Sequence, residues 1–556
     1  MKEKIIKLLS ENLPLSGKEI SNLIEIPPSP ELGDYSFPCF VLSKTLKKNP
    51  NEIALNLSKK IFSEDFEKVE AKGPYLNFFI NSNSLAKETL NSILKQKEKY
   101  GSSAKGRGKK ILIDMSSPNI AKPFGIGHLR STIIGNSISE ICNFLKFKVV
   151  KINYLGDWGT PFGKIIAGYK EFGNEEKLKK EPIKHLYEIY TRASKDESFE
   201  EKGREWFRKL EANNKEAILL WKKFRDLSIK EFEKIYSLLN IKFDVIAGES
   251  NYNKKMDKII AELQEKNLIE KSDNALIVNL EKYNLGAGLI QKADGATLYL
   301  TRDITAAIDR YKRYKFVKMF YEVGSEQRLH FKQLFKVLQL MGYKWADHCI
   351  HIDHGLYLDK DGKKFATRKG KTIFMEDIFE ETKELAEKEI KKREKLGHEE
   401  INRRALAIAR AAIIYGDLKN YRVNDMLFDI DKFISFEGNT GPYLLYSYAR
   451  AKSILRKAGY SPKKSYKINS IAEKEKQLIS KLSSFPEIVS GAYSSLAPNL
   501  IANYSYELSQ LFNEFYHAER VLGSQNEQFR LALVDAFSQV LKNSLFLLGI
   551  PVLEQM

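Results

Sequence analysis

The chain has 556 residues, which is too long for one core and predicts about three or four domains. Its 43% hydrophobic content indicates a globular protein, and 91 Lys+Arg against 72 Asp+Glu give a net charge of +19. The charge favours a polyanionic partner, with nucleic acid first, although a solvated lysine-rich surface would give the same balance. No stretch approaches the ~20 apolar residues of a membrane span. The start, "MKEKIIKLLSENL", lacks signal-peptide features and indicates a short amphipathic helix, so we expect a soluble, cytoplasmic protein.

The first predicted unit is a small α+β domain, residues 1–105. "NEIALNLSKKIF" has helical spacing, and "GPYLNFFI" indicates a strand after a Gly-Pro turn. "KYGSSAKGRGKK", residues 99–110, is rich in Gly, Ser and Lys and is typical of a linker.

A β-loop-α-β segment follows the linker. "KKILID" indicates a buried strand, and "FKVVKINYLG" indicates the next strand. Between them a helix presents one apolar face, made of Leu129, Ile133, Ile134, Ile138, Ile141 and Leu145. This pattern predicts a doubly wound α/β domain over 106–378, with a charged helical insertion at about 166–245.

The loop "AKPFGIGHLRST", residues 121–132, lies between the first strand and the helix start, where free N–H groups bind phosphate readily. Gly125 and Gly127 match the first two glycines of G-x-G-x-x-G, but Arg130 stands at the third. The loop is therefore not a dinucleotide fingerprint.

From about residue 380 every element is predicted to be helical, and "ETKELAEKEIKKREK" indicates a solvated face. The cysteines Cys39, Cys142 and Cys349 form no C-x-x-C pair. The cluster "DHCIHIDHG" contains His348, Cys349, His351 and His354. Metal binding there is an alternative, but the spacing fits no standard zinc pattern, so we expect no zinc.

Four stretches together resemble arginyl-tRNA synthetases, which are class I aminoacyl-tRNA synthetases. They are "SSPNIAKPFGIGH", "NYLGDWGTPFG", "LYLTRDITAAIDRY" and "GKKFATRKGKT". The resemblance also includes "GDYSFPCF", "GESNY" and "SFEGNTGPYLLYSYAR", in the family's order. It implies a Rossmann-like catalytic domain, an N-terminal domain that binds the corner of tRNA, and a helical stem and anticodon-binding domain over 379–556.

The resemblance implies an ATP site at two signatures, the "HIGH" loop and the mobile "KMSKS" loop. The residues implied to bind ATP are Pro118, Gly125, Gly127, His128, Gly324, Lys364 and Lys369. His128, Lys122, Arg368 and Lys369 are implied to be catalytic because they can stabilise phosphate charge.

Two departures from the family pattern affect these signatures. Gly125 stands where the first histidine of the motif is usual, and Thr367 stands where a second loop lysine is usual. We expect Lys122 to replace that lysine in space. The alternatives are a helix-capping role for His128 and an idle solvated Lys122.

The resemblance also implies an arginine site. Asp114, Tyr299 and Asp303 would surround the guanidinium, and Ser117, Asn119 and Gln327 would hold the α-amino and α-carboxyl ends. A planar guanidinium requires matched carboxylates. The alternative for Asp303 is a helix salt bridge.

By the same resemblance, Tyr75 and Asn77 would contact the D-loop of tRNA, and Tyr516 and Met556 would lie near the anticodon. Tyr516 is equally compatible with helix packing. The implied function is arginyl-tRNA synthesis from L-arginine, ATP with Mg²⁺, and tRNA(Arg), by a monomer. Two alternatives stay open: a small-molecule adenylate-forming or nucleotidyl-transfer enzyme, and a tRNA-binding protein that has lost catalysis.

Overall fold

A computed structural model describes residues 1–292, 299–359, 361–365, 367–368, 371–372, 374–462 and 466–556. The chain forms two compact units. Unit 1 consists of Met1–Tyr100, Ala451–Phe485 and Leu508–Leu541. Unit 2 consists of Gly101–Arg450, Pro486–Glu507 and Lys542–Met556.

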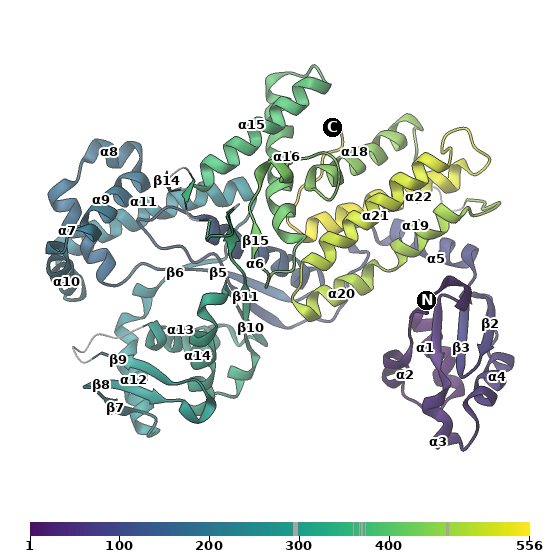
Figure 1. The fold of residues 1–556 in the computed structure, drawn as a ribbon, viewed down its shortest axis with the longest axis horizontal. Helices are drawn as coiled ribbons and strands as arrows, with labels where there is room; N and C mark the ends of the chain where they lie inside the picture. Colours follow the sequence, from purple (N-terminus) through teal and green to yellow (C-terminus); the bar gives the residue numbers. More distant parts are fainter. Residues whose placement is uncertain (293–298, 360, 366, 369–370, 373, 463–465) are drawn as a thin grey trace. The chain divides into compact units, whose positions relative to one another are not determined.

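Unit 1 contains a three-stranded antiparallel sheet of order β1-β3-β2, with short helices around it (Figure 1). Its N-terminal elements are α1 (Lys2–Asn12), α2 (Gly17–Leu23), β1 (Tyr35–Pro38), α3 (Ser43–Leu46), α4 (Pro50–Lys60), β2 (Phe66–Lys72), β3 (Tyr75–Ile80) and α5 (Ser82–Gln96). Helix α4 begins where the Asn49 side chain accepts the Asn51 N–H, and it buries Ile53, Ala54 and Leu57. The predicted helix and strand of this region are confirmed.

Unit 2 is built on a five-stranded parallel sheet of order β11-β10-β4-β5-β6. Its strands are β4 (Lys110–Asp114), β5 (Lys148–Leu155), β6 (Val245–Gly248), β10 (Lys318–Gly324) and β11 (Cys349–His354). The chain proceeds from β4 through β5 to β6 in one direction and from β10 to β11 in the other. The order therefore reverses between β4 and β10, which is the switch point at which doubly wound sheets bind ligands. The predicted fold class is confirmed.

Helix α6 (Ile126–Phe144) joins β4 to β5 and is buried along most of its length. The apolar positions that predicted it, from Leu129 to Ile141, are at most 2% exposed. In the segment predicted to be a linker, residues 100–109 have no helix or strand, but they are packed: Gly106 lies so close to Phe147 that a Cβ would overlap that ring.

Two long insertions separate strands of this sheet along the chain. Between β5 and β6 lie α7 (Thr160–Phe172), α8 (Glu175–Lys180), α9 (Pro182–Lys195), α10 (Ser198–Glu211) and α11 (Lys215–Leu239), which form one helical group in Figure 1. Between β6 and β10 lie η4 (Glu249–Lys255), α12 (Met256–Glu265), β7 (Glu270–Ser272), β8 (Ala275–Asn279), β9 (Ala287–Gln291) and α13 (Tyr299–Tyr314). Strands β7, β8 and β9 form a separate antiparallel sheet, and α14 (Arg328–Leu340) follows β10.

The rest of the chain is mostly helical. Its elements are β12 (Tyr357–Leu358), β13 (Thr367–Arg368), β14 (Lys371–Thr372), α15 (Met375–Arg393), α16 (His398–Leu418), β15 (Met426–Leu427), α17 (Ile430–Phe433), α18 (Gly441–Lys457), α19 (Glu473–Ser483), α20 (Phe485–Ser495), α21 (Asn499–Ala518) and α22 (Glu527–Leu547). The prediction of helices alone after residue 380 is wrong at β15. That segment pairs in parallel with β12, because the Met426 N–H donates to the Leu356 carbonyl.

Helices α18, α21 and α22 each contribute residues to both units. Within unit 2, Ser137 donates a hydrogen bond to the Leu547 carbonyl, and Tyr415 donates one to the Ala502 carbonyl. The core of unit 2 therefore includes residues from the end of the chain. Among the residues that the structure describes, no helix is both long and apolar enough to cross a bilayer.

Candidate active site

The loop after β4 has an unusual backbone. Ser116, Ser117 and Ala121 adopt φ values of 73°, 48° and 59°, in the left-handed region that non-glycine residues rarely occupy. Two hydroxyls hold the loop: Ser131 Oγ accepts the Ser116 N–H at 3.0 Å, and Ser228 Oγ accepts the Ala121 N–H at 2.9 Å. Such strain persists where the surroundings over-determine it, and it clusters at ligand sites.

His128 lies in the first turn of α6, and its tautomer is set by the backbone. The Gly125 N–H donates to Nδ1 of His128 at 3.2 Å, so the neutral ring carries its proton on Nε2. Burial lowers the pKa of His128 to about 4, and Lys122 and His354 add to the decrease. The ring is therefore neutral at pH 7 and can still donate a hydrogen bond from Nε2.

The glycines of this loop have different surroundings. A Cβ on Gly127 would meet no protein atom within 4 Å, whereas one on Gly125 would lie 3.8 Å from Nδ1 of His128, an ordinary contact. Neither glycine is required by the packing of the protein itself. Open space over Gly127 fits close approach of a ligand to the backbone.

Lys122 reaches the helical insertion. Its Nζ lies 4.5 Å from the ring centre of Tyr190, on α9, in a cation–π contact. The same ammonium contributes to the low pKa of His128. Lys122 thus contacts an aromatic ring of the insertion and places a positive charge near His128.

Asp114, at the end of β4, is paired inside the protein. Its Oδ2 lies 2.8 Å from Nη1 of Arg310, and its Oδ1 accepts a hydrogen bond from Ser117 at 3.1 Å. Both partners of the ion pair are buried. Burial raises the pKa of the Asp114 carboxyl, and Arg310 opposes that rise. In this structure Asp114 is therefore paired with the guanidinium of Arg310 and not with that of a substrate.

Tyr299 and Asp303 lie one turn apart on helix α13, so the two residues are on the same face of that helix. Tyr299 is 58% exposed. Asp303 Oδ2 lies 2.6 Å from Nε2 of His330, on α14. The partner of Asp303 is thus a histidine on another helix and not a cation of its own helix.

Sequence reasoning missed three charged side chains near this face: Arg310, Glu249 and Arg302. Glu249, at the start of η4, is 8% exposed, and Nη1 of Arg302 lies 3.7 Å from its carboxylate. Burial raises the pKa of Glu249 to about 8, Arg302 opposes the rise, and Asp303 adds to it. The stretch "GESNY" marked this segment, but nothing in it assigned a role to Glu249. Arg310 could have been found because it follows Asp303 by two helical turns on one face.

The other residues expected to bind arginine or ATP are spread along the same edge of the sheet. Asn119 is exposed, and its side chain covers Gly156, where a Cβ would overlap it. Pro118 is buried beside it, while Gly324 ends β10 on the other side of the switch point. Gln327 is exposed in the short turn that follows Gly324.

The second expected ATP-binding loop is described only in part. Lys364 is exposed, and its Nζ lies 3.0 Å from Glu326 Oε2. Lys369 lies outside the described residues, and for Arg368 only the backbone, in strand β13, is described. Their predicted roles rest on the sequence alone.

The histidine-rich segment forms β11 and its approach. His351 Nε2 lies 2.9 Å from the Val323 carbonyl, His354 Nδ1 lies 2.9 Å from Glu322, and burial raises the pKa of Cys349 to about 12. Strand alternation places His351 and His354 on opposite faces. Among the described residues, no group of three or more His, Cys, Asp or Glu side chains could hold a metal ion.

The residues expected to contact tRNA have unequal exposure. In unit 1, Tyr75 is half-buried beside Phe40, with ring centres 5.8 Å apart. Asn77 is 2% exposed and accepts a hydrogen bond from Ser36, so its side chain lies in the interior. Tyr516, also in unit 1, is 38% exposed and stacks on Phe512. Met556, in unit 2, is half-buried.

Three family models match the chain. They are the N-terminal domain of arginyl-tRNA synthetase over residues 1–80, the catalytic domain of class I tRNA synthetases (R) over 89–430, and the DALR anticodon-binding domain over 444–556.

Full-length relatives and solved structures agree with those models. The chain is 44% identical to the arginine–tRNA ligase of Clostridium perfringens over 100% of both chains, and 45% identical to that of Clostridium kluyveri over 99% of this chain and 98% of the relative. The arginyl-tRNA synthetase structure from Thermus thermophilus shares its fold, with a TM-score of 0.82 at 23% identity, covering 100% of this chain and 99% of that one. The Plasmodium falciparum arginyl-tRNA synthetase aligns with a TM-score of 0.81 at 25% identity, over 100% of this chain and 99% of that one.

Proposed function

The chain belongs to the arginyl-tRNA synthetase family, and on that premise we propose that it joins L-arginine to the 3′ end of tRNA(Arg), using ATP. The observation that carries the proposal is the 44% identity with an arginine–tRNA ligase over the full length of both chains. The structure supports it by bringing the "HIGH" loop, the end of β10 and the Asp303 face of α13 into one unit.

In the first step, an arginine carboxylate oxygen attacks the α-phosphorus of ATP. The bond from that phosphorus to the bridging oxygen breaks, and pyrophosphate leaves. His128 is suited to this step because a neutral ring with its proton on Nε2 donates a hydrogen bond without needing to titrate. Lys122 supplies a positive charge beside it. Gly127 leaves the backbone open to the nucleotide.

Arginine recognition is assigned to the carboxylates near α13. Asp303 is the partly exposed acid, with Tyr299 one turn away to cover the guanidinium. Glu249 is a buried acid that interacts electrostatically with both. Asp114 acts indirectly, because both of its oxygens already bind Ser117 and Arg310. Ser117, Asn119 and Gln327 are proposed to hold the two ends of the amino acid.

In the second step, a hydroxyl of the terminal ribose attacks the carbonyl carbon of arginyl adenylate. AMP leaves as the ester forms, and the hydroxyl proton passes to a phosphate oxygen. The protein provides positioning and charge stabilisation in both steps and no covalent nucleophile. tRNA would contact unit 1 through Tyr75 and Tyr516, whose rings are partly exposed.

Mg²⁺ would enter with ATP. Because no described cluster of three acidic, histidine or cysteine side chains forms a cage, the phosphates would supply most of its ligands. When bound, the ion would neutralise phosphate charge. Family membership also supports a monomer that acts in the cytoplasm.

The decisive experiment is transfer of labelled arginine to tRNA(Arg) by the purified full-length chain, with lysine and ornithine as competing amino acids. Arginine-specific charging is expected. A small-molecule adenylate-forming enzyme would form an adenylate without needing tRNA as acceptor, and a chain that has lost catalysis would bind tRNA(Arg) without charging it.

A further inference from the structure

Arg130 is a buried cation to which the proposed function assigns no role. It stands where a dinucleotide fingerprint would have its third glycine, two residues after His128 on α6. Its side chain is among the largest that are fully buried in the described part of the protein. A guanidinium keeps its charge even in the interior, so burying it is costly unless the protein supplies partners for it.

The partners of Arg130 come from two elements that are far away in the chain. Its Nε lies 3.3 Å from Oδ2 of Asp417, near the end of α16, and its Nη1 donates to the Leu356 carbonyl at 3.3 Å. Its guanidinium carbon lies 5.4 Å from the centre of the Tyr357 ring, on β12. The Tyr357 hydroxyl donates to Oδ2 of Asp417, so the three side chains form one network. Asp417 and Tyr357 are buried as well.

The Arg130 network, which consists of Arg130, Asp417 and Tyr357, is a poor source of stability. Burial raises the pKa of the Asp417 carboxyl, and Arg130 and Tyr357 oppose that rise. Within the described part of the chain, Nη2 of Arg130 is buried and has no hydrogen-bond partner. Desolvation offsets much of the attraction in a buried ion pair, and the best-attested use of such a pair is to fix one register of the elements that it joins. Here those elements are α6, α16 and β12.

Strand β12 leads directly into the second expected ATP-binding loop. The Tyr357 carbonyl accepts a hydrogen bond from the Phe365 N–H at 2.8 Å, and Leu358 forms an antiparallel bridge with Lys364. The position of Tyr357 therefore determines where the backbone at Lys364 lies. Lys364 is one of the residues expected to bind ATP, and its ammonium lies 3.0 Å from Oε2 of Glu326, beyond the end of β10.

Helix α6 provides a common reference for both ATP-binding signatures. The helix is held on the sheet by Ser131, whose hydroxyl donates to the Glu322 carbonyl of β10 at 2.7 Å. His128 lies in its first turn, and Arg130 lies in its second. One helix therefore carries both the histidine of the first signature and the anchor of the segment that leads to the second.

We propose that Arg130 is a positioning residue for adenylate formation. Through its network it holds the segment that carries Lys364 in place for the phosphates of ATP. This inference rests on the proposed function and adds to it a residue that joins the two nucleotide-binding signatures. A planar guanidinium suits this role because it can bind a carboxylate, a carbonyl and an aromatic face at once.

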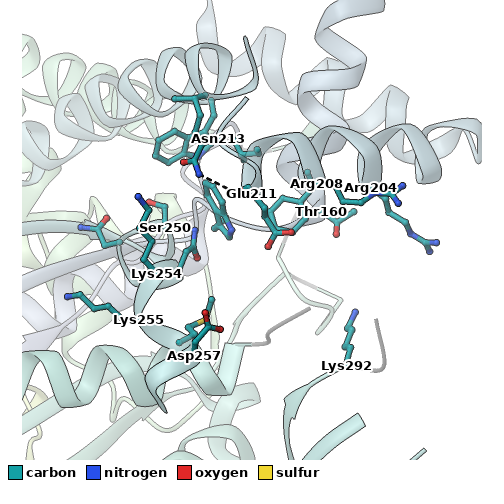
Figure 2. A pocket seen from close by; sticks show the side chains of 18 of the residues that line it. Thr160, Arg204, Arg208, Glu211, Asn213, Ser250, Lys254, Lys255, Asp257 and Lys292 are labelled. Atoms are coloured by element: carbon teal, nitrogen blue, oxygen red, sulfur yellow. Dashed lines mark hydrogen bonds between the residues drawn. The ribbon is translucent and has the colours of Figure 1, made fainter. Parts of the chain in front are cut away.

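The Arg130 network is separate from the large cavity of unit 2. That cavity has a volume of about 1190 Å³, and Arg208 and Lys254 are among the side chains that line it (Figure 2). The three side chains of the network do not line it. A substitution in the network therefore leaves the lining of the cavity as it is.

The test uses Tyr357→Phe, which removes one hydroxyl and keeps the pair of Arg130 and Asp417. Replacing Arg130 itself would leave a buried carboxylate without its cation and is less informative. The matched control is Tyr415→Phe, which removes another buried tyrosine hydroxyl of unit 2. That hydroxyl donates to the Ala502 carbonyl and not to the network.

Adenylate formation is measured with the full-length chain and tRNA(Arg) at saturating arginine. We expect Tyr357→Phe to be roughly 10- to 100-fold slower than the wild type, the scale for a group displaced by about 1 Å. The Kd for arginine should be unchanged, and Tyr415→Phe should stay near the wild-type rate.

A double variant separates positioning from a general loss of packing. Lys364→Ala should slow adenylate formation by itself, and adding Tyr357→Phe should slow it no further, because Tyr357 acts through Lys364. Additive effects of the two substitutions, or an unchanged rate in either single variant, would overturn the inference. An equal decrease in Tyr415→Phe would overturn it as well.

Hydrogen exchange gives a measurement that does not depend on activity. The peptide that contains Phe365 should exchange severalfold faster in Tyr357→Phe than in the wild type, because the Phe365 N–H bonds to the Tyr357 carbonyl. Peptides from α6 should exchange at the same rate in both proteins. Equal exchange of the Phe365 peptide contradicts the proposal. A wild-type chain that forms no adenylate, together with faster exchange in Tyr357→Phe, would refute the proposed function and leave the anchoring of this segment by the Arg130 network standing.

Discussion

Arg310 and Asp114 form an ion pair of 2.8 Å in the interior of unit 2, where both side chains are buried. The sequence predicts that Asp114 receives the guanidinium of a substrate, and in the structure the acid is paired with a guanidinium of the chain. Arg310 is further enclosed by the rings of Tyr154 and Tyr321, at 4.9 and 5.8 Å from its guanidinium carbon. We therefore expect Asp114 to act by holding Ser117 and α13 in place.

Replacing Arg310 with methionine should destabilise the protein, because a buried carboxylate would lose its partner. The expected loss is about 3–5 kcal/mol in the free energy of unfolding, measured by urea denaturation. Adding Asp114→Asn removes the unpaired charge and should recover part of the loss. If the double variant is less stable than Arg310→Met alone, the pair is not the source of the effect.

Substituting Asp303 with asparagine should weaken arginine binding while tRNA binding persists. Truncating one partner of a desolvated charged pair costs roughly 2–5 kcal/mol, so the KM for arginine should rise steeply. His330→Gln is the matched control, because it removes the histidine neighbour and retains the carboxylate. A near-normal KM in Asp303→Asn would show that Asp303 is not a ligand.

Lys122→Ala should slow adenylate formation by roughly 10²–10³ and change arginine affinity little, because a positioned charge near the phosphates is lost. A pre-steady-state measurement of adenylation gives this rate, and Lys222→Ala, an exposed lysine of α11, is the control. Recovery of the rate in Lys122→Ala with Thr367→Lys would support replacement of the missing loop lysine. An unchanged adenylation rate in Lys122→Ala would exclude a role for Lys122 in stabilising the phosphates.

The protein should lose stability as pH rises through the range in which Glu249 titrates. Its folded pKa is about 8 against an ordinary value of 4.5, so the folded state binds more protons between these values. The free energy of unfolding should therefore fall from about pH 4.5 to about pH 8. Above about pH 8, Glu249 should cause no further decrease. Glu249→Gln should flatten that part of the profile, measured by urea denaturation at several pH values. The same slope in both proteins would mean that folding does not raise the pKa of Glu249.

Tyr516→Ala should weaken tRNA binding and leave ATP binding unchanged. Loss of an aromatic surface for a base costs about 1–3 kcal/mol, which a binding titration can detect. Tyr421→Ala is the control, because it removes an exposed ring from unit 2, whereas Tyr516 lies in unit 1. Deletion of residues 436–556 is not an equivalent test, because Ala502 and Leu547 in that region accept hydrogen bonds within unit 2. Equal tRNA affinity in wild type and Tyr516→Ala would mean that the Tyr516 ring packs against Phe512 and does not bind tRNA.

The sequence by itself determined the β4–α6–β5 segment, the family and the "HIGH" loop. Local burial repeats along a helix or strand, so the apolar spacing from Leu129 to Ile141 is visible without coordinates. The position of His128 at a helix start followed from the same pattern.

Only the tertiary structure decided which charges meet. Asp114 and Arg310, Glu249 and Arg302, and Asp303 and His330 are joined because helix α13 packs against elements that are distant from it in the chain, and no periodicity encodes such a pair. Asn77, which was expected from the sequence to contact tRNA, lies in the interior. Its side chain accepts a hydrogen bond from Ser36, the residue opposite it on the neighbouring strand β1. The same reason explains β15 and the terminal helices: their partners are supplied by segments far away in the chain, where a local pattern has no information.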